Sequence, residues 1–173
     1  MSVRPIDSRA WLRRSKSVAT TEIIRMPSPE LCTEAEVAEL VTTFYAKVRD
    51  DTILGPVFER HVADWSRHMP KMVAFWSTAL CGSKSYRGNP MLMHRVLPGL
   101  THSMFEHWLD LFHEAANALP NRAMAERAGE LSQRIAQSLW YDYQLQREPD
   151  RMPDSLPSRA ATPQSTPYPN DHA

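Results

Sequence analysis

Apolar side chains spaced like the turns of a helix, and interrupted by prolines, are the feature that most limits how this chain can fold. Between residues 31 and 147 the large apolar residues recur three and four positions apart, and no stretch keeps the period of two that strands require. The clearest stripe consists of Val37, Leu40, Val41, Phe44, Tyr45 and Val48. Thr33 and Glu36 precede it at the spacing of a capping box. We therefore predict an all-α fold.

Further predicted helices are separated by prolines and glycines. Apolar stripes span residues 65–80, 105–116 and 124–139, and Gly55-Pro56 indicates a turn before the first of them. After residue 80 there is room only for a short helix between Asn89-Pro90, which can begin a helix, and Pro98, which cannot continue one. The prolines therefore divide the chain into long helices and a short one.

The two ends of the chain differ in composition from the part between them. Most of the 14 prolines lie outside residues 30–147. Residues 1–30 are basic and lack the apolar run of a secretory signal, and the acidic Asp7 and Glu22 fit an organellar transit peptide poorly. Residues 148–173 are rich in Pro, Ser and Thr and offer little to bury. We expect a flexible basic arm over 1–30, one domain over 31–147 and a disordered tail over 148–173.

The charge balance and the short apolar runs argue against two classes of partner. The chain has 20 Lys and Arg residues against 20 Asp and Glu residues, so it lacks the basic excess typical of nucleic-acid-binding proteins. Its longest uninterrupted apolar run, Met72–Trp76, is far too short to cross a membrane. We expect neither nucleic acid nor a membrane as a partner.

Cysteine and glycine usage narrows the class of protein further. Cys32 and Cys81 are too few for a disulfide framework and too far apart in sequence for a cysteine-based zinc site, which indicates a reducing compartment and a cytoplasmic location. The five glycines form no phosphate-binding loop, so nucleotide chemistry is disfavoured.

Histidines carry more information about a site than the other titratable residues do. No pairing of a nucleophile with a base can be recognised, so we assign no catalytic residue. His94 lies in the short predicted helix, and His68 lies on the same broad face as the apolar stripe over residues 65–80. A buried imidazole needs a partner, which is either a hydrogen bond within the core or a metal. Both interpretations remain open on the spacing alone.

Aromatic residues are numerous for so few helices. They include Phe44, Tyr45, Phe58, Trp65, Phe75, Trp76, Phe105, Trp108 and Phe112. Stripes of this kind usually pack a core, and the alternative is that they enclose a flat apolar ligand that completes the packing.

Several segments, taken together in their order and spacing, resemble the group III truncated haemoglobins over roughly residues 31–147. These segments are FYAKVRDD at 44–51, LGPVF at 54–58, Trp65-x-x-His68, Phe75-Trp76, Tyr86-x-Gly88-x-Pro90, His94 followed by Leu97-Pro98, and FxxWLxLF at 105–112. The resemblance implies a globin-like fold, in which helices form a two-over-two sandwich around haem b.

The resemblance also implies a role for particular residues. His94 matches the proximal histidine, which binds the haem iron as its single protein ligand and leaves the opposite position open. Tyr45, His68 and Trp108 match polar positions on the distal, ligand-binding side. The remaining matches are Lys71 at a position that pairs with a haem propionate, and Phe58, Met72, Trp76 and Leu97 in the pocket wall.

The function implied by the resemblance is binding of dioxygen and other diatomic ligands at a five-coordinate iron. One alternative is an enzyme that oxidises nitric oxide or reacts with peroxide, which would need a separate reductase. Another alternative is a haem-free helical interaction module, in which the aromatic residues are ordinary core. The sequence does not decide whether the protein is an enzyme.

Overall fold

The computed structural model describes residues 27–158, and this part of the chain contains six α-helices and no strands. The helices are α2 (Glu34–Asp50), α3 (Gly55–His61), α4 (Trp65–Cys81), α5 (Pro90–Arg95), α6 (His102–Asn117) and α7 (Arg122–Arg147). The predicted all-α fold is confirmed, although the sequence indicated only a turn where α3 begins. None of the described helices is long and apolar enough to cross a membrane.

Side-chain caps explain where most of these helices begin. Thr33 and Glu36 form the predicted capping box of α2, since the Glu36 amide donates to Thr33 Oγ1 at 3.3 Å and the Thr33 amide donates to Glu36 Oε2 at 2.7 Å. The side chains that cap the other long helices and α5 are Asp64, Asn89, Thr101 and Asn121. These contacts satisfy amides that have no partner within their own helix.

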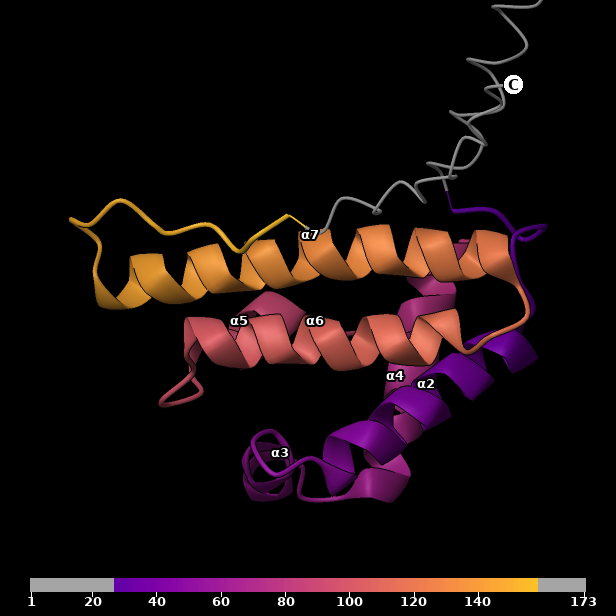
Figure 1. Ribbon diagram of the computed structural model, residues 1–173, viewed down its shortest axis with the longest axis horizontal. Coiled ribbons are helices and arrows are strands. Elements are labelled where there is room, and N and C mark those ends of the chain that lie inside the picture. Colours follow the sequence, from indigo (N-terminus) through magenta and orange to yellow (C-terminus); the bar gives the residue numbers. More distant parts are fainter. Residues whose placement is uncertain (1–26, 159–173) are drawn as a thin grey trace, which may run out of the picture.

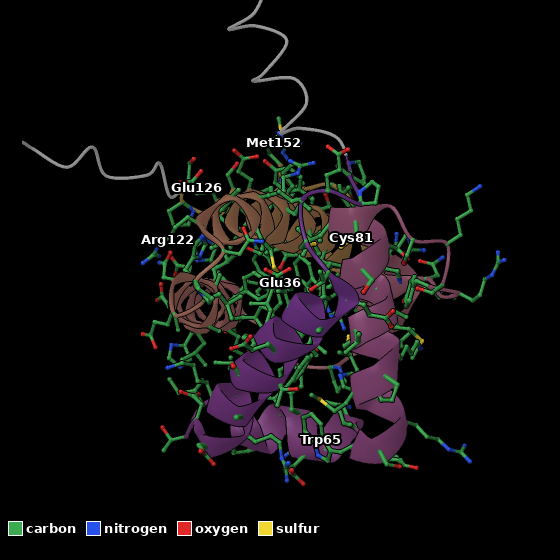
Figure 2. The ribbon with its side chains drawn as sticks, turned by 90° about the vertical axis from the view of Figure 1, so that its right-hand side faces the viewer. Glu36, Trp65, Cys81, Arg122, Glu126 and Met152 are labelled. Atoms are coloured by element: carbon green, nitrogen blue, oxygen red, sulfur yellow. The ribbon has the colours of Figure 1, made fainter. Side chains whose placement is uncertain are left out.

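The helices are arranged in two layers. Helices α6 and α7 lie side by side, joined by a short loop, and form one layer (Figure 1). Helices α2 and α4 pack on each other and form the second layer, in which α4 runs from Trp65 to Cys81 (Figure 2). Contacts of α2 with α6 and of α4 with α7 join the layers, which is the predicted two-over-two sandwich.

Two groups of buried side chains fill the sandwich. The larger lies between the layers, and its fully buried members include Leu40, Phe44, Leu80, Phe112 and Met124. The smaller joins α6, α7 and the end of the described chain, and it consists of Phe105, Leu109, Ala136, Leu139, Trp140, Tyr143 and Leu156. These side chains are predominantly apolar, so their burial supplies the main stabilisation of the fold.

The segment after α7 differs from the expected disordered tail. Residues 148–158, here called the C-terminal strap, run back along α7 (Figure 1). The amide of Asp154 donates to Gln144 Oε1 at 2.9 Å, and the amide of Leu156 donates to Gln137 Oε1 at 2.8 Å. The ordered part of the domain therefore extends to residue 158, while the rest of the expected tail, and all but the end of the basic arm, lie outside the described residues.

Candidate functional site

A cavity of about 270 Å³ opens between the two layers, bounded by residues of α2, α3, α4, α5, α6 and α7. Most of its lining is apolar. All the site residues predicted from the sequence line it, namely Tyr45, Phe58, His68, Lys71, Met72, Trp76, His94, Leu97 and Trp108. The fold thus brings together residues from helices that are far apart in the chain.

His94 reaches the cavity from the short helix α5. Its Nδ1 lies 2.8 Å from the carbonyl oxygen of Pro90, and because a carbonyl can only accept, Nδ1 must carry the hydrogen. Burial lowers the pKa of His94, although the bond to Pro90 opposes this shift, so the ring is held neutral at physiological pH. Nε2 is then the nitrogen with a free lone pair, which is the arrangement found in histidines that bind metals.

Tyr45 projects into the cavity from α2, where its side chain is buried. Burial raises the pKa of Tyr45, so its hydroxyl keeps its proton and remains a donor. Its ring meets those of His68 and Phe58 edge-on, at centroid distances of 5.2 and 5.9 Å. The hydroxyl has no hydrogen-bond partner among residues 27–158.

His68 lies on α4, and its Nε2 is buried without a hydrogen-bond partner in the described part of the chain. Burial lowers the pKa of His68, and the charge of Lys71, together with that of His94 when His94 is protonated, lowers it further. A buried polar atom left unpaired costs about 1–3 kcal/mol. In the wall of a cavity, such an atom indicates that the occupant of the cavity supplies the partner.

Trp108 and Trp76 show how aromatic residues serve both the core and the cavity. Each stacks on the buried ring of Phe112, at centroid distances of 5.3 and 4.7 Å, and each also lines the cavity. Trp108 is further fixed by the edge of Phe44 at 5.2 Å. The same rings therefore both pack the core and line the cavity, and enclosure of a flat ligand stays a prediction.

Lys71 and the apolar wall complete the cavity. Lys71 is exposed and lies one helical turn beyond His68, so its ammonium group can pair with an anionic group at the rim. Phe58 of α3, Met72 of α4 and Leu97, just after α5, supply partly buried apolar surface. A flat, largely apolar group with acidic substituents fits this lining.

Trp65 does not line the cavity, but it packs behind two residues that do, and no role was assigned to it from the sequence. Its ring lies 5.8 Å from that of Tyr45 and 5.5 Å from that of His68, and its indole N–H donates to Glu59 Oε1 at 3.1 Å. The guanidinium of Arg49 lies over the same ring at 5.0 Å. The spacing of Trp65 and His68, which places them on one face of a helix, was the available signal.

The residues of the cavity fit haem. His94 offers one neutral imidazole nitrogen, Lys71 offers a cation at the rim, and the walls between them are apolar. His68 brings a buried nitrogen that lacks a partner in the described chain, and Tyr45 brings a protonated hydroxyl. This combination of a single metal-binding nitrogen, a dry wall and unpaired polar atoms is what a haem protein with an open coordination position needs.

Comparison with known proteins gives the same family as the sequence resemblance. The sequence model of the bacterial-like globin family matches residues 30–139. The group 3 truncated hemoglobin ctb of Campylobacter jejuni is 35% identical over an alignment of 121 residues that covers 66% of this chain and 95% of that protein. The crystal structure of the group III truncated hemoglobin from Campylobacter jejuni superposes with a TM-score of 0.59 and 34% identity, covering 62% of this chain and 88% of that one.

Proposed function

Because the chain belongs to the bacterial-like globin family, and within it matches the group III truncated haemoglobins, we propose that it binds dioxygen and other diatomic ligands at a haem iron held by His94. That it binds haem follows from the family. The observation that carries the assignment of His94 is the bond from Nδ1 to the Pro90 carbonyl, which leaves Nε2 free in an apolar cavity.

Six residues of the cavity lining would hold haem. His94 would bind the iron through Nε2, and Lys71 would pair with a propionate at the rim. The porphyrin would be enclosed by the apolar surface of Phe58, Met72, Trp76 and Leu97, which all line the cavity. Cys32 and Cys81 lie outside that lining, which supports haem b, held without a covalent bond to the chain.

The polar residues on the distal side would stabilise a ligand. Haem supplies an iron with one coordination position open for a diatomic molecule. Tyr45 keeps its proton and lacks an internal partner, so its hydroxyl is available to donate to a polarised ligand. Trp108 adds an indole donor, and His68 adds an imidazole whose buried Nε2 is unpaired.

Replacing His94 tests this proposal directly. We expect His94→Ala to lose stable haem uptake, because the iron loses its only protein ligand. His113→Ala is the matched control, since His113 Nδ1 makes the same kind of bond, 2.6 Å to the Leu109 carbonyl, but lies outside the cavity lining. Soret absorption after haem addition to each purified variant is the measurement, and normal uptake by His94→Ala would refute the proximal role.

A cytoplasmic location is also part of the proposal. Cys32 and Cys81 are free thiols in different parts of the sequence that the fold brings together. Burial is the main cause that raises the pKa of the Cys32 thiol to about 12, and a hydrogen bond with Cys81 adds to it. Neighbouring free thiols are typical of proteins in a reducing compartment.

A further inference from the structure

Helix α5, which carries His94, is too short to fix its own position. It has six residues, whereas an isolated helix in water needs roughly 12–15 residues to be even marginally stable. Its apolar side chains Leu92 and Met93 are 52% and 56% exposed, and only Met91 packs, partly buried, against the smaller buried group formed by α6 and α7. Among the described helices α5 packs on α7, and α7 must therefore determine where α5 lies.

A salt bridge joins the last residue of α5 to α7. The guanidinium of Arg95 makes two hydrogen bonds to the carboxylate of Asp142. Nε donates to Oδ2 at 3.0 Å, and Nη2 donates to Oδ1 at 2.6 Å. The Asp142 side chain is only 18% exposed. A two-bond contact of this kind fixes orientation as well as distance, because guanidinium and carboxylate are both planar.

Arg147, in the last turn of α7, holds the backbone of the same segment. Its guanidinium donates to the carbonyl of Arg95 at 3.2 Å and to the carbonyl of Leu97 at 2.7 Å. It also lies over the ring of Tyr143 at 3.6 Å. The Tyr143 hydroxyl in turn accepts from the amide of Leu100 at 2.9 Å. Backbone groups from residue 95 to residue 100 are thus held by two neighbouring side chains of α7.

We propose that Asp142, Tyr143 and Arg147, here called the proximal clamp, are positioning residues that set the direction of the His94 ring. The ring is bonded to Pro90 within its own helix, so its direction follows the backbone of α5. The clamp holds that backbone at the end of α5 from outside the cavity. This inference rests on the proposed function, because it takes His94 as the haem ligand.

The test compares Arg147→Ala with Arg122→Ala in the full, haem-loaded chain. Arg122 is a matched control at the opposite end of α7 (Figure 2). Its Nη1 donates to the carbonyl of Asn117, the last residue of α6, at 3.0 Å. In Arg147→Ala we expect the iron–histidine stretching band of the ferrous protein to shift or broaden, and haem release to become about tenfold faster, as for other residues that orient metal ligands. Arg122→Ala should keep the band and release rate of the unaltered protein.

A second readout does not depend on haem. Amide hydrogen exchange of the haem-free chain, followed by mass spectrometry, should be faster over residues 91–100 in Arg147→Ala than in Arg122→Ala. Tyr143→Phe, which keeps the stacked ring but loses the bond to Leu100, should show a smaller increase in the same segment. Asp142→Asn, which weakens the contact with Arg95, should also shift the iron–histidine band. Exchanging the two charges, with Arg95→Asp combined with Asp142→Arg, should restore most of the original band.

The outcomes separate the clamp from the proposed function. If the unaltered protein shows no iron–histidine band, both the role of His94 and the clamp are wrong. If the band is present and is lost in His94→Ala, but Arg147→Ala matches Arg122→Ala in band, haem release and exchange, the clamp alone is wrong. A lower unfolding temperature in Arg147→Ala with an unchanged band also overturns it, because these residues would then only stabilise the fold.

Discussion

At the scale of single residues, Tyr45 best shows how burial prepares a side chain for a ligand. Aromatic rings surround it, burial keeps its hydroxyl protonated, and no residue between 27 and 158 accepts its hydrogen bond. The ring that carries this donor is held in place before any ligand arrives, and only the O–H bond has to rotate. The hydroxyl therefore pays little ordering entropy when it binds one.

We expect Tyr45→Phe to release dioxygen about tenfold faster, because one hydrogen bond to a polarised ligand is worth about 1–2 kcal/mol. Stopped-flow measurement of dioxygen dissociation from the ferrous protein checks this. Tyr141→Phe is the control, since the Tyr141 hydroxyl lies 2.6 Å from Ser155 Oγ, outside the cavity. Equal rates in the unaltered protein and Tyr45→Phe would remove Tyr45 from the distal side.

The sequence could predict which residues line the cavity, but not the tautomer or the hydrogen-bond partners of their side chains. Tyr45 and Trp108 lie on apolar stripes whose period places them inward, and the ordered segments around His94 identified the family. The tautomer of His94 depends on where the turn of α5 puts the Pro90 carbonyl, and the unpaired Nε2 of His68 depends on what surrounds it from other helices. Neither is encoded in spacing.

At the scale of elements, the C-terminal strap shows the limit of reading order from composition. A stretch rich in proline, with no helical or strand period, predicts disorder. Two kinds of contact hold the strap on α7 instead. Leu156 is buried, with only 4% of it exposed, and Gln137 and Gln144 make hydrogen bonds with the strap backbone. In a sequence, glutamines on a helix indicate a face exposed to solvent, so their hydrogen bonds with the strap backbone could not be predicted.

We expect Leu156→Ala to lower the free energy of unfolding by about 2–3 kcal/mol, the lower part of the range for truncating a buried leucine. Urea unfolding followed by circular dichroism measures the change. Met152→Ala serves as control, because Met152 lies on the same strap and is 85% exposed (Figure 2). Similar small losses in both variants would show that the strap contributes little to stability.

At the scale of the whole molecule, three carboxylates join parts of the chain that are distant in sequence. Glu36 of α2 accepts from Asn121 at 2.9 Å, Asp51 accepts from His107 of α6 at 2.7 Å, and Asp142 of α7 pairs with Arg95. Burial raises the pKa of each carboxylate, and at Asp51 it is the largest single cause. The hydrogen bonds together outweigh burial, so the pKa of each of the three is lowered. Each carboxylate therefore holds its proton less tightly in the folded chain than in the unfolded one.

Acid should therefore weaken the fold. The stabilisation from a carboxylate with a lowered pKa is complete above its unfolded pKa of about 4 and is lost as the pH falls through the folded value. We expect the free energy of unfolding to decrease from pH about 5 to pH about 2. Asp51→Asn should flatten this decrease and Asp50→Asn, at the exposed neighbouring position, should not. Denaturant titrations across this pH range would decide, and identical slopes for both variants would exclude Asp51 as a contributor.

The attachment of α5 to the far end of α7 also bears on how relatives of this protein can diverge. The outer turns of a terminal helix accept substitutions easily, whereas a pocket wall does not. If the proximal clamp acts as proposed, exchanges at Asp142 or Arg147 would alter how His94 is held while every side chain that lines the cavity stays the same. Two such proteins with identical pockets would then differ in how the histidine is held because of residues outside the pocket.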